Sequence, residues 1–284
     1  MGYAHIDYFI IAYPEEKAYH KIYQNGGLFM KPLLEVKDVS LSYHSLLGET
    51  AALSHISFEL MHEEFLAIVG PSGCGKSTLL NLICGLLNAE LGSILLDGVP
   101  VLGSSAKIGY MLQREHLLEW RSIYRNVLLG LEIRKELTPE NLTYVEEMLK
   151  TYGLDKFRNS RPSQLSGGMR QRAALIRTLA LRPDLLLLDE PFSALDYQTR
   201  LNVSDDIGKI LKKQKKPAIL VTHDISEAIS MADRVIILTS RPAAISRIIP
   251  IDLGIQNRTP MSSRNAPVFK SYFNLIWKEL NHNA

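Results

Sequence analysis

The sequence predicts an α/β fold with a mixed central sheet, an antiparallel β layer beside it, and an inserted helical subdomain. The apolar run Phe65–Val69 leads through a glycine-rich loop into residues with helical spacing, which is typical of a buried strand followed by a helix. Between Leu34 and Leu60 apolar and polar residues alternate, which indicates strands with one solvent-exposed face. This pattern favours an antiparallel layer. From about 114 to 164 the spacing becomes helical.

The composition bounds the class of protein. With 284 residues, of which 46% are apolar and 22% charged, the chain can form one large or two small globular domains. A net charge of +2 gives no argument for a nucleic-acid partner. The eight histidines show no metal-ligand spacing, and no apolar run approaches the ~20 residues that cross a membrane. The two cysteines exclude a disulfide scaffold, and we expect an intracellular, reducing compartment.

Residues 1–29 are rich in tyrosine and lack clear periodicity, so we expect an N-terminal extension ahead of the folded domain. A specific hypothesis is that translation begins at Met30. The codons of Gly26 and Gly27 can read GGA GGT, a bacterial ribosome-binding sequence, two codons ahead of Met30. The mass of the native N-terminus tests this hypothesis, since a mass that includes Met1 rejects it.

The loop after Phe65–Val69 fits the phosphate-binding pattern G-x-x-x-x-G-K-[ST]. Its residues are Gly70, Pro71, Ser72, Gly73, Cys74, Gly75, Lys76, Ser77 and Thr78. The glycines let successive backbone N–H groups point at phosphate oxygens, beside the positive end of a helix. Lys76 adds a charge for the β- and γ-phosphates, and the Ser77 hydroxyl is placed to bind Mg²⁺. The alternative is an ordinary glycine-rich turn between a strand and a helix.

Cys74 and Cys84 lie in this loop and in the helix that follows it. One interpretation is that both are small packing residues. A second hypothesis makes Cys74 a reactive thiol near bound phosphate, because the N-terminus of a helix lowers the pKa of a thiol.

Strand-like runs lie on both sides of the phosphate-binding loop. Tyr43 ends one of them ahead of a polar loop at 44–50, and its ring can either stack on a purine or pack on its neighbours. Gln113 follows another, where an uncharged polar side chain can hold a metal-bound water. These runs are 34–36, 39–43, 56–60, 93–98 and 108–112.

The region between Gln113 and Gln164 is expected to form helices. Thr138 caps one of them, Pro139 occupies its first turn and Gly153 ends it. Its apolar residues recur at helical spacing: Leu142, Val145, Met148, Leu149 and Tyr152. The run 117–120 places bulky apolar groups beside a charge, which fits either core or a partner surface.

The segment Leu165–Met169 precedes a strongly helical run. Ser166, Gly167 and Gly168 would then stand at a helix N-terminus, where a hydroxyl and bare N–H groups can bind an anion. The alternative is a helix cap after a flexible turn.

Two later apolar runs end in chemically active side chains. Leu185–Leu188 indicates a strand buried on both faces, and it delivers Asp189 and Glu190 to the edge that carries the phosphate-binding loop. Asp189 can hold Mg²⁺ through water, and Glu190 can polarise an attacking water; the alternative is two solvated acids. Ala218–Thr222 likewise delivers His223, which is either a structural histidine or a γ-phosphate contact.

The last strands are expected at 233–238 and 245–251. Residues 253–284 are expected to be a C-terminal tail, in which apolar residues recur at helical spacing: Phe269, Tyr272, Phe273, Ile276, Trp277 and Leu280. We expect one amphipathic helix that folds back on the domain or contacts a partner.

Taken together, these segments resemble the nucleotide-binding subunit of ABC transporters over nearly all of residues 33–250. The resemblance rests on their order along the chain: the phosphate-binding loop, Gln113, Leu165–Met169, Leu185–Glu190, Ser193-Ala194-Leu195-Asp196 and His223. A kinase or GTPase with the same loop has no Leu-Ser-Gly-Gly segment before the Asp-Glu strand. The resemblance implies a P-loop NTPase fold of the ABC type over residues 30–252, with the helical subdomain at about 114–164.

The resemblance also implies a site and its chemistry. Two copies would enclose two ATP molecules head to tail, and the segment Ser166–Gly168 and Asp196 of one copy would complete the site of the other. The implied roles are general base for Glu190, γ-phosphate sensor for His223, link between Mg²⁺ and the helical subdomain for Gln113, and adenine platform for Tyr43. The implied catalytic set is Lys76, Gln113, Glu190 and His223, and the implied Mg²⁺ ligands are Ser77, Gln113 and Asp189.

Within the ABC family, the chain looks like the nitrate, sulfonate and taurine importer group. The likeness rests on Leu-Ser-Gly-Gly-Met followed by Arg-Gln-Arg, on Leu117-Leu118-x-Trp120, and on Ser240-Arg241-Pro242 ahead of Ile249–Leu253. Met169 and Glu119 stand where glutamine and proline are usual, so the cargo and the docking surface stay open.

The importer likeness implies partners and a location. It implies a homodimer of ATPase subunits, an integral-membrane permease, a separate substrate-binding protein and a place on the cytoplasmic face of the membrane, with no nucleic acid. One alternative is another small-molecule importer, such as one for a thiamine precursor. The other is a soluble ABC ATPase that acts on DNA or ribosomes and has no role in transport.

Overall fold

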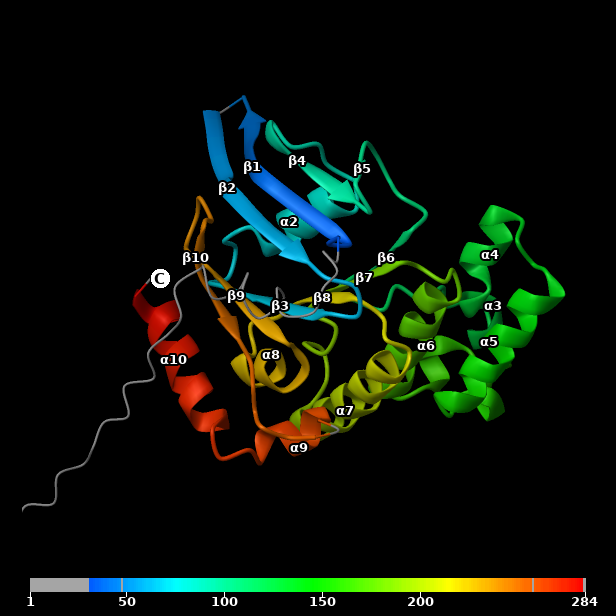
Figure 1. The fold of residues 1–284 in the computed structure, drawn as a ribbon. Helices are drawn as coiled ribbons and strands as arrows, with labels where there is room; N and C mark the ends of the chain where they lie inside the picture. The colour runs from blue at the N-terminus through cyan, green and yellow to red at the C-terminus, as the bar shows by residue number, and fades with distance from the viewer. Residues whose placement is uncertain (1–30, 47, 257, 283–284) are drawn as a thin grey trace, which may run out of the picture. The chain divides into compact units, whose positions relative to one another are not determined.

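The computed structural model describes residues 31–46, 48–256 and 258–282. The expected N-terminal extension, residues 1–29, and the proposed start at Met30 lie outside the described residues. The described chain forms two sheets, of six and four strands, with helices packed on them (Figure 1). None of the helices in this part of the chain is long and apolar enough to cross a membrane.

The larger sheet has the strand order β10-β9-β3-β8-β7-β6. Its strands are β3 (Phe65–Val69), β6 (Ile108–Met111), β7 (Leu185–Asp189), β8 (Ala218–Val221), β9 (Arg234–Leu238) and β10 (Ile245–Pro250). Neighbours pair in parallel except β10, which runs antiparallel to β9. The sheet is therefore mixed, as predicted, and the carboxyl ends of all its strands but β10 meet at one edge.

Strand β3 shows why such an apolar run folds into a buried layer. All of its residues are buried, and they alternate between two cores. Leu66 and Ile68 pack in the core under the antiparallel layer, whereas Ala67 and Val69 belong to a second core on the other face. α2 (Lys76–Ile83) lies in the first core, and the other face is covered by α6 (Gly167–Leu179), α7 (Tyr197–Lys213) and α8 (Ile225–Met231) (Figure 1).

The smaller sheet is antiparallel, with the order β2-β1-β4-β5. It comprises β1 (Leu34–Ser45), β2 (Gly48–Leu60), β4 (Leu91–Leu96) and β5 (Val99–Pro100). The runs expected at 34–36 and 39–43 are one strand, because Asp38 adopts a left-handed conformation (φ 53°) at an irregularity that lets β1 continue. Most of the loop expected at 44–50 belongs to β1 and β2.

The helical subdomain comprises α3 (Ile123–Val127), α4 (Leu129–Arg134), α5 (Pro139–Thr151) and two 3₁₀ turns, Asp155–Phe157 and Pro162–Gln164. As predicted, Thr138 caps α5, and its side chain accepts the Asn141 N–H at 3.3 Å. Asn126 is fully buried and bonds both the N–H and the carbonyl of Leu118, so it holds the run 117–120 in place.

The run 117–120 is partly buried and partly exposed. Leu117 packs against the core, whereas Trp120 is 73% exposed. Leu117 therefore belongs to the edge of the core, and Trp120 lies at the surface.

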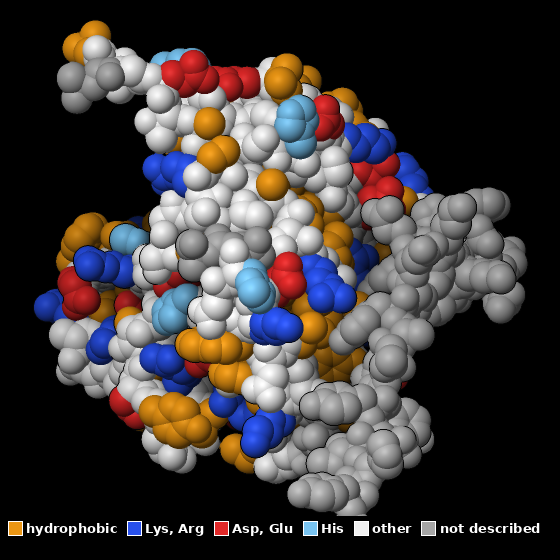
Figure 2. Space-filling model, turned by 90° about the vertical axis from the view of Figure 1, so that its left-hand side faces the viewer, with side chains coloured by type: hydrophobic (Ala, Val, Ile, Leu, Met, Phe, Trp, Pro, Cys, Tyr) orange, Lys and Arg blue, Asp and Glu red, His pale blue; other side chains and the backbone are white. Residues whose placement is uncertain are grey.

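The C-terminal tail folds back on the domain. α9 (Pro260–Arg264) is held against α7, since the Met261 N–H donates to Asp205 Oδ1 at 2.8 Å. α10 (Phe269–His282) buries Ile276 in the core and leaves Trp277 half exposed. On the visible part of the face that carries α10, basic, acidic and apolar side chains are interspersed (Figure 2).

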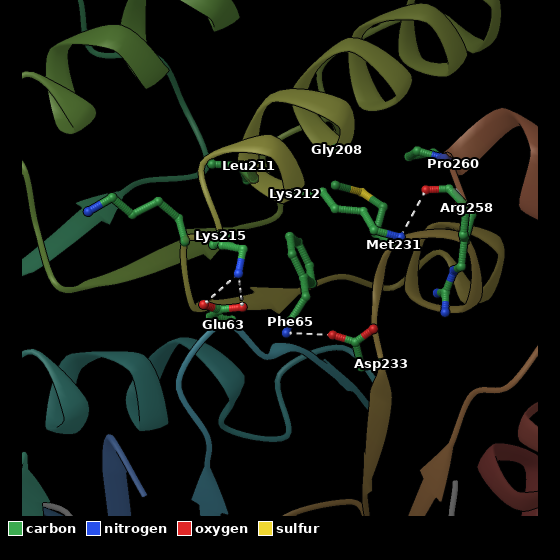
Figure 3. Close-up of a pocket in the computed structure, with 12 residues that line it drawn as sticks. Glu63, Phe65, Gly208, Leu211, Lys212, Lys215, Met231, Asp233, Arg258 and Pro260 are labelled. Atoms are coloured by element: carbon green, nitrogen blue, oxygen red, sulfur yellow. Dashed lines mark hydrogen bonds and ion pairs between the residues drawn. The ribbon is translucent and has the colours of Figure 1, made fainter. Parts of the chain in front are cut away.

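A cavity of about 290 Å³ lies between the end of α7 and the start of the tail (Figure 3). Its lining combines apolar side chains with Arg258 and with Lys215, which pairs with Glu63 at 3.1 Å. Phe65, which also lines it, begins β3 and donates its N–H to Asp233 Oδ2 at 2.9 Å. The cavity is thus at the amino ends of the parallel strands, away from the edge that carries the phosphate-binding loop.

Candidate active site

The phosphate-binding loop connects β3 to α2 at the carboxyl edge of the larger sheet. Gly75 has a φ of 128°, and a Cβ there would lie 2.9 Å from Leu53 Cδ2, so the position requires glycine. As the N-cap of α2, Gly75 has no side chain to occupy the first N–H groups, which remain available to an anion. Lys76 is buried, and its Nζ donates to the Gly70 and Pro71 carbonyls at 2.9 Å each. The ammonium is therefore folded over the loop, within reach of a phosphate held there.

Asp189 ends β7 beside this loop. Its buried carboxylate accepts hydrogen bonds from the Ser77 side chain and from the Tyr110 hydroxyl, the latter at 3.3 Å. Burial raises the pKa of Asp189, and the bonds from Ser77 and Tyr110 oppose that rise. Burial also raises the pKa of Tyr110, so the phenol keeps its proton and remains the donor. A hydroxyl and a carboxylate side by side are oxygen ligands of the kind that Mg²⁺ prefers, so Ser77 and Asp189 fit the expected metal.

Glu190, Gln113 and His223 meet around one carboxylate oxygen, and we call these three residues the Glu190 cluster. Gln113 Nε2 donates to Glu190 Oε2 at 3.1 Å, and His223 Nδ1 lies 3.2 Å from the same atom. Glu190 has a left-handed backbone (φ 44°), and its N–H donates to the Val221 carbonyl at 2.8 Å. A non-glycine residue in this conformation is strained, and strain of this kind clusters at functional sites. The ends of β6, β7 and β8 thus position the cluster.

Tyr43 is anchored to the start of α2. Its hydroxyl lies 3.1 Å from Thr78 Oγ1, within hydrogen-bond distance. The residue is 43% exposed, so a large part of the ring faces solvent. The structure thus holds the ring by its hydroxyl, while much of the residue stays exposed.

The segment Ser166–Gly168 and Asp196 lie at the starts of α6 and α7. Ser166 caps α6 by accepting the Met169 N–H at 3.3 Å, and Asp196 caps α7 by accepting the Thr199 N–H at 3.0 Å. Hydrogen bonds from Thr199 also lower the pKa of Asp196. Among the described residues, no hydrogen bond or ion pair joins either helix start to the phosphate-binding loop.

Cys74 and Cys84 are both free and buried. Burial raises the pKa of each thiol, and the charge of Lys76 opposes this rise at Cys74 without reversing it. The structure supports the packing interpretation, and the hypothesis of a reactive Cys74 thiol is wrong.

Comparison with known proteins decides the family. Residues 53–193 match the family model described as ABC transporter. The chain is 45% identical over 248 residues to the ABC transporter ATP-binding protein YtlC of Bacillus subtilis (strain 168), covering 87% of this chain and 95% of YtlC. The chain belongs to the ABC transporter family.

Two other ABC relatives have names that include a cargo. The nitrate transport protein NasD of Klebsiella oxytoca is 36% identical over 228 residues, which cover 79% of this chain and 87% of NasD. The aliphatic sulfonates import ATP-binding protein SsuB of Bacillus licheniformis is 37% identical over 231 residues, which cover 81% of this chain and 88% of SsuB.

The fold has a close structural counterpart in the ABC family. The chain is similar to the dimeric ATP-binding cassette MJ0796 bound to ADP and Pi, with a TM-score of 0.67 and 30% identity over 77% of this chain and 99% of that one. The predicted ABC-type fold is confirmed, with its mixed sheet, antiparallel layer and inserted helical subdomain. As a member of the family, the chain binds ATP and is an ATP hydrolase.

Two contacts beside the ABC site come from residues that were not predicted as site residues. Arg241 Nη2 donates to the Gly73 carbonyl at 2.7 Å, so it holds the tip of the phosphate-binding loop. Gln171 donates from α6 to the Pro191 carbonyl, directly after Glu190. Arg241 had a signal in the sequence, since it belongs to the Ser-Arg-Pro motif. Gln171 is the middle residue of the Arg-Gln-Arg run noted in the sequence, but that run does not predict this contact, because the contact depends on how α6 packs against the end of β7.

Proposed function

We propose that this chain is the ATP-hydrolysing subunit that couples energy to the import of a small solute through a membrane permease, with a nitrate-, sulfonate- or taurine-like cargo. The observation that carries the proposal is the meeting of Lys76, Asp189 and the Glu190 cluster at one edge of the sheet. The name of SsuB, which includes import, supports the direction of transport, and the names of NasD and SsuB support nitrate and sulfonates as the class of cargo. An ATP site by itself does not choose a cargo, because other chains bind it.

In this proposal the Glu190 cluster performs the hydrolysis. Both neighbours contact Glu190 Oε2, so Oε1 is placed to accept the proton of the attacking water. His223 is half exposed at the same edge and would contact the γ-phosphate. Lys76 exchanges its bonds to the loop carbonyls for bonds to the β- and γ-phosphates, which carry more charge and bind an ammonium more strongly.

Three residues would hold Mg²⁺. Ser77 and Asp189 already lie against one another, and Gln113 reaches the same edge from the end of β6. The ion, when bound, neutralises charge on the phosphates. Gln113 would then link bound Mg²⁺ to the helical subdomain that follows it in the chain.

Two copies would complete each other's sites. Among the described residues, no hydrogen bond or ion pair joins the starts of α6 and α7 to the phosphate-binding loop of their own chain. In this proposal a second chain brings a Ser166 hydroxyl and the α6 N-terminus to the γ-phosphate. The similar MJ0796 cassette is dimeric, which supports this arrangement. An isolated monomer should therefore hydrolyse ATP slowly.

The permease is proposed to dock where Trp120 leaves the core. Its side chain is 73% exposed at the end of a run that Asn126 holds rigidly. Aromatic side chains presented in this way dominate the binding energy of many interfaces. The chain would then lie on the cytoplasmic face of the membrane, and a separate substrate-binding protein would deliver the solute.

Co-purification of the tagged chain from membranes tests the proposed function. We expect a membrane permease in the complex, and ATP-dependent uptake of nitrate, a sulfonate or taurine by vesicles that contain it. Uptake of a thiamine precursor instead would keep the importer and reject the class of cargo. Recovery of ribosomes or DNA without a permease would reject transport.

A further inference from the structure

The guanidinium of Arg200 contacts two segments that reach the site from different helices. Arg200 lies in the first turn of α7, just after the segment Ser193–Asp196, and its Nη2 donates to the Leu195 carbonyl at 3.0 Å. On its other side, Nη1 lies 3.7 Å from Asp224 Oδ2, and Nε lies 3.9 Å from Glu227 Oε1. The planar guanidinium of Arg200 therefore lies between the segment ahead of α7 and the start of α8.

The start of α8 holds His223 from both sides. Asp224, the next residue, caps α8 by accepting backbone N–H groups of its first turn. Thr222, the preceding residue, donates its hydroxyl to Glu227 Oε2 at 2.7 Å and accepts the Asp224 N–H at 3.0 Å. The backbone on either side of His223 is thus tied to the two carboxylates that Arg200 contacts, while the imidazole reaches into the Glu190 cluster.

The contacts of Arg200 are close but incomplete. Its Nε is buried and has no hydrogen-bond partner among the described residues. Both carboxylates lie just beyond hydrogen-bond distance, so a small shift of Leu195 would bring the fork fully onto one of them. Glu227 is buried, and burial raises its pKa to about 7, so the charge of this carboxyl responds to the cation beside it. The guanidinium of Arg200 is therefore bonded to Leu195 and only loosely paired with the carboxylates of Asp224 and Glu227.

We propose that Arg200 is a positioning residue that transmits the position of the segment Ser193–Asp196 to His223 within each copy. The inference rests on the proposed function, in which that segment lies between two copies of the chain. Docking of the second copy moves Leu195, Arg200 follows through its bond to that carbonyl, and the carboxylates of α8 adjust the backbone around His223. Hydrolysis is thereby restricted to the closed dimer.

The test is Arg200→Met, which keeps a long unbranched side chain and removes the fork. The kcat and KM for ATP are measured on the purified full-length chain. We expect kcat to fall by about 10- to 100-fold, which is the effect of displacing a reacting group by about 1 Å, while KM and ATP binding by the monomer stay near their wild-type values. Arg200→Lys keeps the positive charge but lacks the planar guanidinium, so its kcat should lie between that of the wild type and that of Arg200→Met.

Arg234→Met is the matched control. Arg234 pairs with the buried Glu64 at 3.3 Å, donates to the Glu59 carbonyl and, among the described residues, has a buried Nε without a hydrogen-bond partner, as Arg200 has. It begins β9, however, at the amino edge of the sheet. Arg234→Met should lose thermal stability as Arg200→Met does, because each change leaves a buried glutamate without its cation, and it should keep the wild-type kcat.

A second pair of variants separates positioning from folding. Adding Glu227→Gln to Arg200→Met removes the buried carboxylate that has lost its cation, and it should restore Tm without restoring kcat. Adding Glu190→Gln to Arg200→Met should still allow an ATP-bound dimer to form.

Four results would overturn the inference. They are a wild-type kcat in Arg200→Met, a loss of kcat equal to that of Arg234→Met, recovery of kcat together with Tm in the Arg200→Met/Glu227→Gln chain, and failure of the Arg200→Met/Glu190→Gln chain to dimerise. A wild-type chain that neither hydrolyses ATP nor joins a permease would instead reject the proposed function.

Discussion

Replacement of Glu190 by glutamine tests the chemistry assigned to the Glu190 cluster. The amide keeps the shape of the side chain and an oxygen that can accept the Gln113 bond, but it removes the negative charge and the base. The left-handed backbone at Glu190 is held by its N–H bond to Val221, which the substitution does not touch. We therefore expect the folded chain to be preserved.

The expected magnitude follows from the geometry of the cluster. A general base contributes about 10²- to 10⁴-fold to a rate, or about 2.7–5.5 kcal/mol of transition-state stabilisation. Because Gln113 and His223 both contact Oε2 at 3.1 and 3.2 Å, the carboxylate is well positioned, and we expect the upper half of this range. Loss of the negative charge also reduces repulsion of the triphosphate, so the ATP-bound dimer should persist.

Phosphate release at saturating ATP and size-exclusion chromatography in the presence of ATP measure the two effects. Glu190→Gln should lose nearly all turnover and elute as a dimer with ATP. Glu147→Gln, a substitution of an exposed glutamate on α5, serves as the control. It should keep the wild-type rate of phosphate release and the wild-type elution in the presence of ATP. Turnover of Glu190→Gln at more than about a tenth of the wild-type rate would refute the reasoning, since a base worth less than tenfold lies below the range for general bases.

Three further predictions concern other parts of the chain. Ser166→Arg should abolish steady-state phosphate release while the monomer still binds ATP, because it blocks the contribution of the second copy; a fully active variant argues against a shared site. Tyr43→Ala should weaken ATP binding in calorimetry by about tenfold, since stacking on an aromatic ring contributes about 1–3 kcal/mol per base, whereas Tyr43→Phe should bind nearly as wild type. Burial raises the pKa of Glu227 from 4.5 to about 7. Between these two pH values the folded state holds a proton that the unfolded state has lost, so the free energy of unfolding should fall as pH rises from 4.5 to about 7. Urea denaturation should show this fall, at most roughly 3 kcal/mol, in the wild type and less of it in Glu227→Gln.

Much of the fold and of the site was predictable because its signals are local. The loop around Lys76 is one contiguous motif, and apolar runs mark the strands that end at Asp189 and Glu190. In a sheet with parallel strands, strand ends that carry polar residues share an edge, so the approach of Gln113 and His223 to Glu190 followed from their positions after strands. The cap at Thr138 was predictable for the same reason, since it depends on residues three positions apart.

Other features depended on surroundings that no local pattern contains. The sequence predicted two separate strands, at 34–36 and 39–43, where the structure has the single strand β1. The prediction was wrong because the irregularity at Asp38 is stabilised by pairing with both β2 and β4. The hypothesis of a reactive Cys74 failed because burial outweighs the nearby Lys76 charge. Burial of a single side chain is decided by every element packed around it, not by its neighbours in the chain.

The sequence by itself determined the family, the strands of the central sheet and the residue types that can bind and hydrolyse a triphosphate. It could do so because motif spacing and hydrophobic periodicity are local properties of the chain. Only the tertiary structure decided which of these groups touch: Tyr110 with Asp189, Arg241 with Gly73, and Arg200 with both Leu195 and the start of α8. Such contacts depend on strand register and helix packing between segments far apart in the chain, and a shift of one residue in either would separate the partners.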